Sequence, residues 1–117
     1  MNNAEKRKAT PIYSGVVKYF PLALAEIAIC SQAGNDQHNP NTSLHWDRAK
    51  SGDELDALVR HLTDHASGEI FDEGGVRHLT KVAWRALAAL QKAMEQDADL
   101  NKSIIDDLPF FTNNTNI

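Results

Sequence analysis

Apolar positions recur at helical spacing in three segments of the chain, residues 20–33, 52–66 and 76–95. In the first segment apolar side chains occur all round the helix, which is typical of a central helix rather than a half-exposed one. We find no internal repeat and no convincing strand. The pattern therefore predicts an all-α fold, a helical bundle with two apolar stripes in its core. The stripes consist of Leu55, Leu58, Val59 and Leu62 in the second segment and of Val76, Leu79, Ala83, Ala86, Leu87, Leu90 and Met94 in the third.

A long polar loop separates the first two predicted helices. Gly34 followed by Asn35 predicts that the first helix ends at residue 33, so the loop spans residues 34–50. Loops of more than about 12–15 residues in a compact domain are usually functional or disordered. This loop holds a tryptophan among histidines and cations, which favours the functional interpretation. Its candidate binding residues are Asn35, His38, Asn39, Trp46, Arg48 and Lys50.

Length and charge narrow the class of protein. A chain of 117 residues predicts one domain, with an N-terminal arm at 1–17 and a C-terminal tail at 98–117. The formal net charge of −4 argues against a nucleic-acid partner. The single cysteine, Cys30, excludes an internal disulfide and a zinc site built from several cysteines. The longest apolar stretch, residues 20–30, is too short to span a bilayer, so we expect a cytoplasmic protein with no membrane partner.

Several carboxylates stand where they could bind a metal ion. Glu26 lies in the middle of the most apolar helix, and a buried carboxylate is costly unless it is paired or bound to metal. Asp53 and Asp56 lie one helical turn apart, a spacing that suits hard cations such as Mg²⁺. The alternatives are that Glu26 reaches solvent or an arginine, and that the acidic first turn only favours the helix dipole. Asp72 precedes the third helix and is a further ligand candidate or an N-cap.

The basic and histidine residues also fall at helical spacing. His78, Lys81 and Arg85 share a face opposite the apolar stripe of the third helix, with Arg77 beside them. Such a face is either a clamp for phosphates or simply solvated. His61 and His65 lie one turn apart, as in short zinc-hydrolase motifs, but the glutamate that completes those motifs is missing.

The motifs that carry a family resemblance span about residues 16–92. They are Lys18-Tyr-Phe-Pro-Leu-Ala-Leu-Ala-Glu26, His38-Asn-Pro40, Leu44-His-Trp46, Arg60-His-Leu62, Asp72 with Gly75 and Arg77-His78, and Lys81-Val-Ala-Trp-Arg-Ala-Leu87. With them the chain resembles the bacteriophage dATP/dGTP diphosphohydrolases, the MazZ-type branch of the MazG-like all-α nucleoside triphosphate pyrophosphohydrolases. The wider superfamily binds Mg²⁺ with Glu-x-x-Glu and Glu-x-x-Asp pairs, whereas this chain offers Asp53-x-x-Asp56 and Asp72.

The resemblance implies hydrolysis of a purine deoxynucleoside triphosphate, with dGTP or dATP as the best candidate, to the monophosphate and pyrophosphate. It also implies a role in phage nucleotide or modified-base metabolism in the infected bacterium, and a homodimer or homotetramer. The candidate residues suit a reaction assisted by Mg²⁺ or Mn²⁺. The expected metal ligands are Glu26, Asp53, Asp56, His61 and Asp72, the expected catalytic residues are Glu26, Asp56 and Lys81, and the expected substrate contacts are Arg77, His78, Lys81 and Arg85 together with the loop residues named above.

Two other classes of function stay open at this point. A non-enzymatic helical interaction protein would show an exposed apolar surface and no binding of divalent metal. A zinc-dependent hydrolase that uses His61 and His65 would hold zinc tightly, whereas a Mg²⁺ enzyme would lose its ion easily because carboxylate sites bind it weakly.

Overall fold

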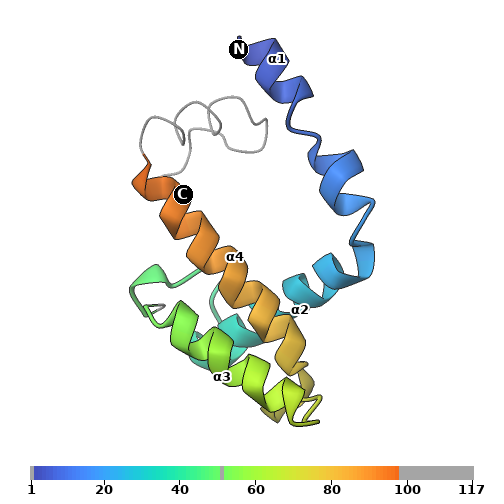
Figure 1. Ribbon diagram of the computed structural model, residues 1–117. Coiled ribbons are helices and arrows are strands. Elements are labelled where there is room, and N and C mark those ends of the chain that lie inside the picture. Colours follow the sequence, from blue (N-terminus) through green and yellow to red (C-terminus); the bar gives the residue numbers. More distant parts are fainter. Residues whose placement is uncertain (1, 51, 98–117) are drawn as a thin grey trace. The chain divides into compact units, whose positions relative to one another are not determined.

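A computed structural model describes residues 2–50 and 52–97 (Figure 1). In this part the chain is all-α, as the apolar pattern predicts, and its only β-type contact is an isolated bridge between Phe71 and Arg77. The predicted tail at 98–117 lies outside the described residues. The α-helices are α1 (Asn3–Lys8), α2 (Pro21–His38), α3 (Glu54–Ala66) and α4 (His78–Gln96), and the short helical turns are η1 (Tyr13–Val17), η2 (Arg48–Lys50) and η3 (Glu73–Gly75).

The chain divides into two compact units. One contains the described residues 2–20 and 91–97, and the other contains residues 21–90. The predicted arm is largely helical, since α1 and η1 both lie within it. Every candidate site residue lies in the second unit, so the site is described within that unit. Over the described residues, no helix by itself is long and apolar enough to cross a membrane, although segments 3–17 and 21–38 reach that length and composition as a bent pair.

The prediction that the first helix ends at residue 33 is wrong. α2 continues through Gly34 and Asn35 to His38. The side chain of Asn35 is buried and bonds to the chain that follows: its Nδ2 donates to the Thr42 carbonyl (3.2 Å), and its Oδ1 accepts from the backbone N–H of His45 (3.4 Å). These contacts hold residues 39–47 back against the helix end, which a local stop signal does not reveal.

The predicted core stripe of α3 is also wrong for this chain. Leu55, Val59 and Leu62 are 68%, 58% and 45% exposed, while Glu54 and Ala57 are buried. The stripe predicted for α4 is reversed in part: Leu79, Leu87 and Leu90 are exposed while His78 and Ala88 are buried, but Val76, just before α4, is buried as predicted. The apolar α2, predicted to be central, likewise buries only Asn35. Polar side chains therefore share the inside of the unit with Ala57, Val76 and Ala88, and most leucines of the two stripes lie on its outside.

Candidate active site

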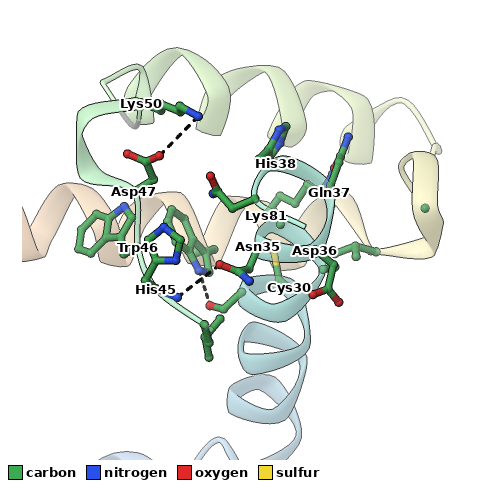
Figure 2. Close-up of a pocket in the computed structure, with 18 of the residues that line it drawn as sticks. Cys30, Asn35, Asp36, Gln37, His38, His45, Trp46, Asp47, Lys50 and Lys81 are labelled. Atoms are coloured by element: carbon green, nitrogen blue, oxygen red, sulfur yellow. Dashed lines mark hydrogen bonds and ion pairs between the residues drawn. The ribbon is translucent and has the colours of Figure 1, made fainter. Parts of the chain in front are cut away.

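A cavity of about 850 Å³ lies within the second unit, a size typical of ligand pockets. Its walls come from the C-terminal half of α2, the loop after it, α3 and α4. Figure 2 shows Trp46, Lys81 and Cys30 among the side chains around it. The predicted site residues that line the cavity are Asn35, His38, Asn39, Trp46, Lys50, His61, Lys81 and Arg85.

Two indole rings form the aromatic part of the wall. Trp46 from the loop and Trp84 from α4 lie edge to face, with ring centroids 5.7 Å apart. The Trp84 indole N–H donates to Ser31 Oγ at 2.8 Å, which fixes its ring against α2. Arg48 lies outside the cavity lining, and its guanidinium covers the Trp46 ring at 4.3 Å. This wall can take a flat aromatic group by stacking or edge contact.

Trp84 is a site residue that the sequence did not predict. The available signal was its spacing, because Trp84 follows Lys81 by three residues and so shares its helix face. Asn35, by contrast, was expected to contact substrate, and the structure assigns its amide to the loop contacts described above. Its role is therefore to position the loop that carries Trp46.

Each cation at the cavity is paired with a carboxylate. Lys81 Nζ lies 2.6 Å from Asp72 Oδ2, and Lys50 Nζ lies 3.5 Å from Asp47 Oδ2. The Arg85 guanidinium lies 3.4 Å from Asp53 Oδ1 and 3.3 Å from Glu54 Oε1. The hydrogen bond from Lys81 holds the pKa of Asp72 below its ordinary value, with a smaller contribution from the backbone N–H of Glu73. Asp72 is therefore an ionised carboxylate at neutral pH.

A glycine turn places Asp72. Gly74 and Gly75 have φ angles of +85° and +84°, a conformation that other residues rarely adopt. Asp72 Oδ1 accepts the backbone N–H of Glu73 at 2.8 Å, so Asp72 is the N-cap of η3 and not of the third predicted helix, which begins at His78 as α4. Its second oxygen, Oδ2, points to Lys81. One carboxylate thus caps the turn and also faces the site.

His61 and His78 meet beside this carboxylate. Their Nδ1 atoms lie 2.9 Å apart, and His61 Nδ1 lies 4.0 Å from Asp72 Oδ2. One of the two nitrogens must carry the hydrogen and the other must accept it, so at most one of them donates. Burial lowers the pKa of His61 below its ordinary value, and Asp72 partly opposes that shift. His61 is therefore neutral at pH 7.

His78 itself is 97% buried, at 3% exposure, and carboxylates lie near both of its ring nitrogens. Its Nε2 lies 3.4 Å from Glu69 Oε2, and its Nδ1 lies 3.9 Å from Asp64 Oδ2. The structure therefore brings together His61, Asp72, His78 and Lys81 of the predicted residues.

The remaining predicted residues lie elsewhere. Glu26 is half-buried on α2, and Asp56 is exposed beside Asp53 at a separate hollow near the start of α3. Arg77 is exposed and lies over the Phe71 ring at 4.9 Å. Within the described residues, Glu26, Asp53 and Asp56 belong to neither of the two groups of three donor residues close enough to share an ion. Glu54, which sequence analysis left without a site role, is buried and paired with Arg85.

Comparison with known proteins gives one match. A family model described as dATP/dGTP diphosphohydrolase, N-terminal, matches residues 1–102. No curated protein matches the chain, and no solved structure does. The match covers the cavity, both indole rings and the histidine pair, so it includes every residue of the site. Because it spans well over half of the sequence, the chain belongs to the dATP/dGTP diphosphohydrolase family.

Proposed function

We propose that the chain hydrolyses a purine deoxynucleoside triphosphate, dGTP or dATP, to the monophosphate and pyrophosphate. The family points to this class of activity. The observation that carries the proposal is a single cavity with two indole rings, three cationic side chains and three histidines on its walls. A triphosphate needs the cations and a purine base suits the rings.

The base would lie against Trp46 and Trp84, because their rings are the flat apolar surfaces of the cavity. Stacking alone does not separate guanine from adenine, since that discrimination needs hydrogen-bonding groups at fixed positions. His38 and Asn39 line the same cavity and are the proposed polar contacts to the base.

The phosphates would lie near Lys81 and Arg85. Lys81 acts as a point charge and Arg85 as a planar fork, and both stabilise charge on a leaving pyrophosphate. Lys81 reaches the cavity from α4 while its ammonium contacts Asp72, so it lies between the binding space and the carboxylate. Lys50 adds a third cation from η2.

A divalent ion, Mg²⁺ or Mn²⁺, belongs to this proposal. When bound, such an ion neutralises phosphate charge and lowers the pKa of a water. Of the expected ligands, His61 and Asp72 are the pair that the fold brings within reach of each other, and a spacing of 4.0 Å fits two ligands of one ion. A carboxylate would accept the proton of the attacking water. Glu26 and Asp56 are the carboxylates that were expected to be catalytic, and neither lines the cavity.

We also propose a homodimer or homotetramer. The exposed stripe of Leu55, Val59 and Leu62 is apolar along the length of α3, and a second copy of the chain would bury it. The proposed setting is the cytoplasm of an infected bacterium, where the enzyme would serve phage nucleotide or modified-base metabolism, as the family resemblance implies.

A substrate panel tests the proposal. The full chain is incubated with each of the four deoxynucleoside triphosphates and either Mg²⁺ or Mn²⁺, and turnover is measured with Lys81→Ala and Trp84→Ala alongside. We expect a preference for purines, loss of most turnover in Lys81→Ala, and a higher KM in Trp84→Ala. Lack of turnover with every nucleotide and metal would contradict the proposal and favour the interaction protein.

A further inference from the structure

Three donor atoms from three separate elements converge beside the cavity. They are His61 Nδ1 on α3, His78 Nδ1 on α4 and Asp72 Oδ2 at the start of η3, and all lie within 4.8 Å of one another. The two histidine nitrogens are 2.9 Å apart, and the carboxylate oxygen is 4.0 Å from His61 Nδ1. Ligands held at about 2.0–2.2 Å from one ion lie roughly 3–4 Å from each other. The spacings are therefore close to those that a shared ion requires.

We propose that His61, His78 and Asp72 form a binding site for a transition-metal dication of the Mn²⁺, Co²⁺ and Zn²⁺ class, in preference to Mg²⁺. Imidazole nitrogen suits these ions, whereas Mg²⁺ takes oxygen ligands and keeps much of its water. This site makes His78 a metal ligand rather than the substrate contact that the sequence suggested. The inference rests on the proposed function only where it concerns the ion's part in catalysis, and binding of the ion does not depend on that function.

Glu69 supports this assignment. A histidine that binds a metal through one nitrogen commonly donates its other N–H to a carboxylate, which fixes the tautomer and the ring orientation. His78 has this arrangement, since its Nε2 lies 3.4 Å from Glu69 Oε2 while its Nδ1 faces His61. The ring is 3% exposed and so is held by its surroundings. Glu69 is therefore a positioning residue for the metal ligand.

Lys81 competes with the ion. Its ammonium lies 2.6 Å from Asp72 Oδ2, the same oxygen that faces His61. A dication bound at that oxygen meets a positive charge, so Lys81 weakens metal binding while it neutralises Asp72 in the absence of an ion. Removal of the ammonium is therefore expected to tighten metal binding, although it should reduce turnover. Opposite effects on binding and turnover are a signature that a merely structural lysine would not give.

Another set of donors shares His78 and is a weaker candidate. Asp64 and Glu69 lie close enough to His78 to form a group of three. Their side chains are 40% and 65% exposed, against 11% for His61 and 26% for Asp72. Water screens exposed carboxylates and weakens their hold on an ion. The more buried set is therefore the proposed site.

Titration of the full chain with Co²⁺ tests the site, with no nucleotide present. Binding is followed by the visible absorption of the ion and by calorimetry, and Mn²⁺, Zn²⁺ and Mg²⁺ serve as competitors. We expect saturable binding that an excess of Mg²⁺ does not displace. Asp72→Asn and His61→Ala should each lower the affinity by at least roughly 10-fold. Glu69→Gln should lower it by a similar factor, and Lys81→Met should raise it.

His65→Ala is the matched control. His65 lies one turn after His61 on α3 and outside both groups of donors, so its removal should leave the affinity unchanged. Circular dichroism checks that each variant keeps its helices. His61 and Asp72 are the ligands chosen for substitution because they are less buried than His78. The inference would be overturned if Co²⁺ binding were not saturable, or if Mg²⁺ bound equally tightly. It would also be overturned if His61→Ala and Asp72→Asn left binding unchanged, or if His65→Ala abolished it.

The two proposals fail in different ways. Metal binding with the expected dependence on His61 and Asp72, but without turnover of any nucleotide, would leave this site standing and contradict the proposed function. Turnover with Mg²⁺ that survives His61→Ala, together with no saturable Co²⁺ binding to the full chain, would support the proposed function and overturn the transition-metal site.

Discussion

Asp72 shows how a single side chain serves the fold and the site together. Oδ1 accepts from the Glu73 backbone at 2.8 Å, and Oδ2 accepts from Lys81 at 2.6 Å. Two glycines with positive φ make the turn that allows this geometry. Since one oxygen is used on the backbone, the other is held in a fixed direction toward His61. The site therefore depends on this turn, which also contributes Glu73 and Gly74 to the cavity wall.

The first prediction compares two aspartates. Asp72→Asn should lower turnover by at least about 10-fold, because it removes the charge that faces His61 and Lys81. Asp56→Asn is the matched control, since Asp56 is exposed and lies outside both groups of donors. Steady-state kinetics of both variants, with helix content checked by circular dichroism, gives the comparison. A larger loss in Asp56→Asn would restore the assignment that the sequence favoured and contradict the one made from the structure.

The second prediction concerns Cys30, which lines the cavity. Burial raises the pKa of its thiol above the ordinary value, and Lys81 and Arg85 oppose this shift. The thiol should therefore be protonated at neutral pH and react slowly with iodoacetamide in the folded chain. The reaction should become faster as pH rises, and it should proceed at the ordinary rate when urea unfolds the chain. As it is the only cysteine, labelling reports on this site directly. Bound dGTP should slow labelling further, and labelling indifferent to nucleotide would count against the cavity as the binding site.

The raised pKa also affects stability. A group whose pKa is higher in the folded chain binds its proton more tightly there, so its contribution is present below the unfolded pKa. That contribution is lost as pH rises through the folded pKa. The free energy of unfolding should therefore fall as pH rises through the alkaline range, and Cys30→Ser should make this fall smaller.

At the scale of elements, α3 and α4 pack through their polar faces. Glu54 begins α3 and is 6% exposed, and it meets Arg85 from α4 at 3.3 Å. Further along, His61 meets His78. The contacts join the two helices at both ends of the shared face. The fold thus uses polar pairs where small domains commonly use leucines.

The third prediction tests that packing. Arg85→Met leaves the buried Glu54 carboxylate without its guanidinium, and we expect a loss of about 2–4 kcal/mol in the free energy of unfolding. Removal of both charges in Glu54→Gln with Arg85→Met should cost less than Arg85→Met alone, because the buried side chain at position 54 is then no longer charged. Urea unfolding measures all three. Additive losses in the double variant would show that the pair does not couple the helices.

Local patterns predicted three of the four α-helices in the described residues, but they did not predict α1, and they placed the end of α2 at residue 33 instead of His38. The apolar periodicity predicted the helical segments that became α2, α3 and α4, since spacing is a local property. Spacing predicted that His78, Lys81 and Arg85 share one helix face, and the length and composition of the polar loop marked it as functional. Lys81, Arg85 and Trp46 of these residues line the cavity. Which face turns inward was predicted wrongly, because the same amphipathic pattern suits a core within one chain or a surface between chains.

The arrangement of the site depends on contacts between residues that are distant in sequence. His61 and His78 are 17 residues apart and meet only because α3 and α4 pack as they do. Asn35 fails as a helix stop because its amide bonds to residues 7 and 10 positions later. Neither contact has a local signal, so the donor group that includes His78 could not be predicted from spacing.

At the scale of the whole molecule, much apolar surface stays outside. Leu55, Val59 and Leu62 on α3 and Leu79, Leu87 and Leu90 on α4 are all exposed within the described residues. A monomer that keeps such stripes in water forgoes the free energy of their burial, about 25 cal/mol per Å². This cost is the physical basis for proposing a second copy of the chain.

The fourth prediction is an oligomer in solution. Light scattering coupled to size exclusion should give a mass of two or four chains, and Val59→Glu should give one chain, because a buried charge opposes association. Arg60→Glu is the control, since it places the same charge next to the stripe on an exposed polar position and should leave the mass unchanged. A wild-type mass of one chain would contradict the proposal.

The most direct test of the proposed reaction is product analysis in H₂¹⁸O with dGTP and Mn²⁺. Attack of water on the α-phosphorus releases pyrophosphate in one step and leaves the new oxygen on the monophosphate. We predict dGMP that carries ¹⁸O, with unlabelled pyrophosphate. Label in the pyrophosphate would mean attack on the β-phosphorus, and release of inorganic phosphate or triphosphate would mean a different phosphohydrolase. Any of these outcomes would contradict the reaction assigned to this site.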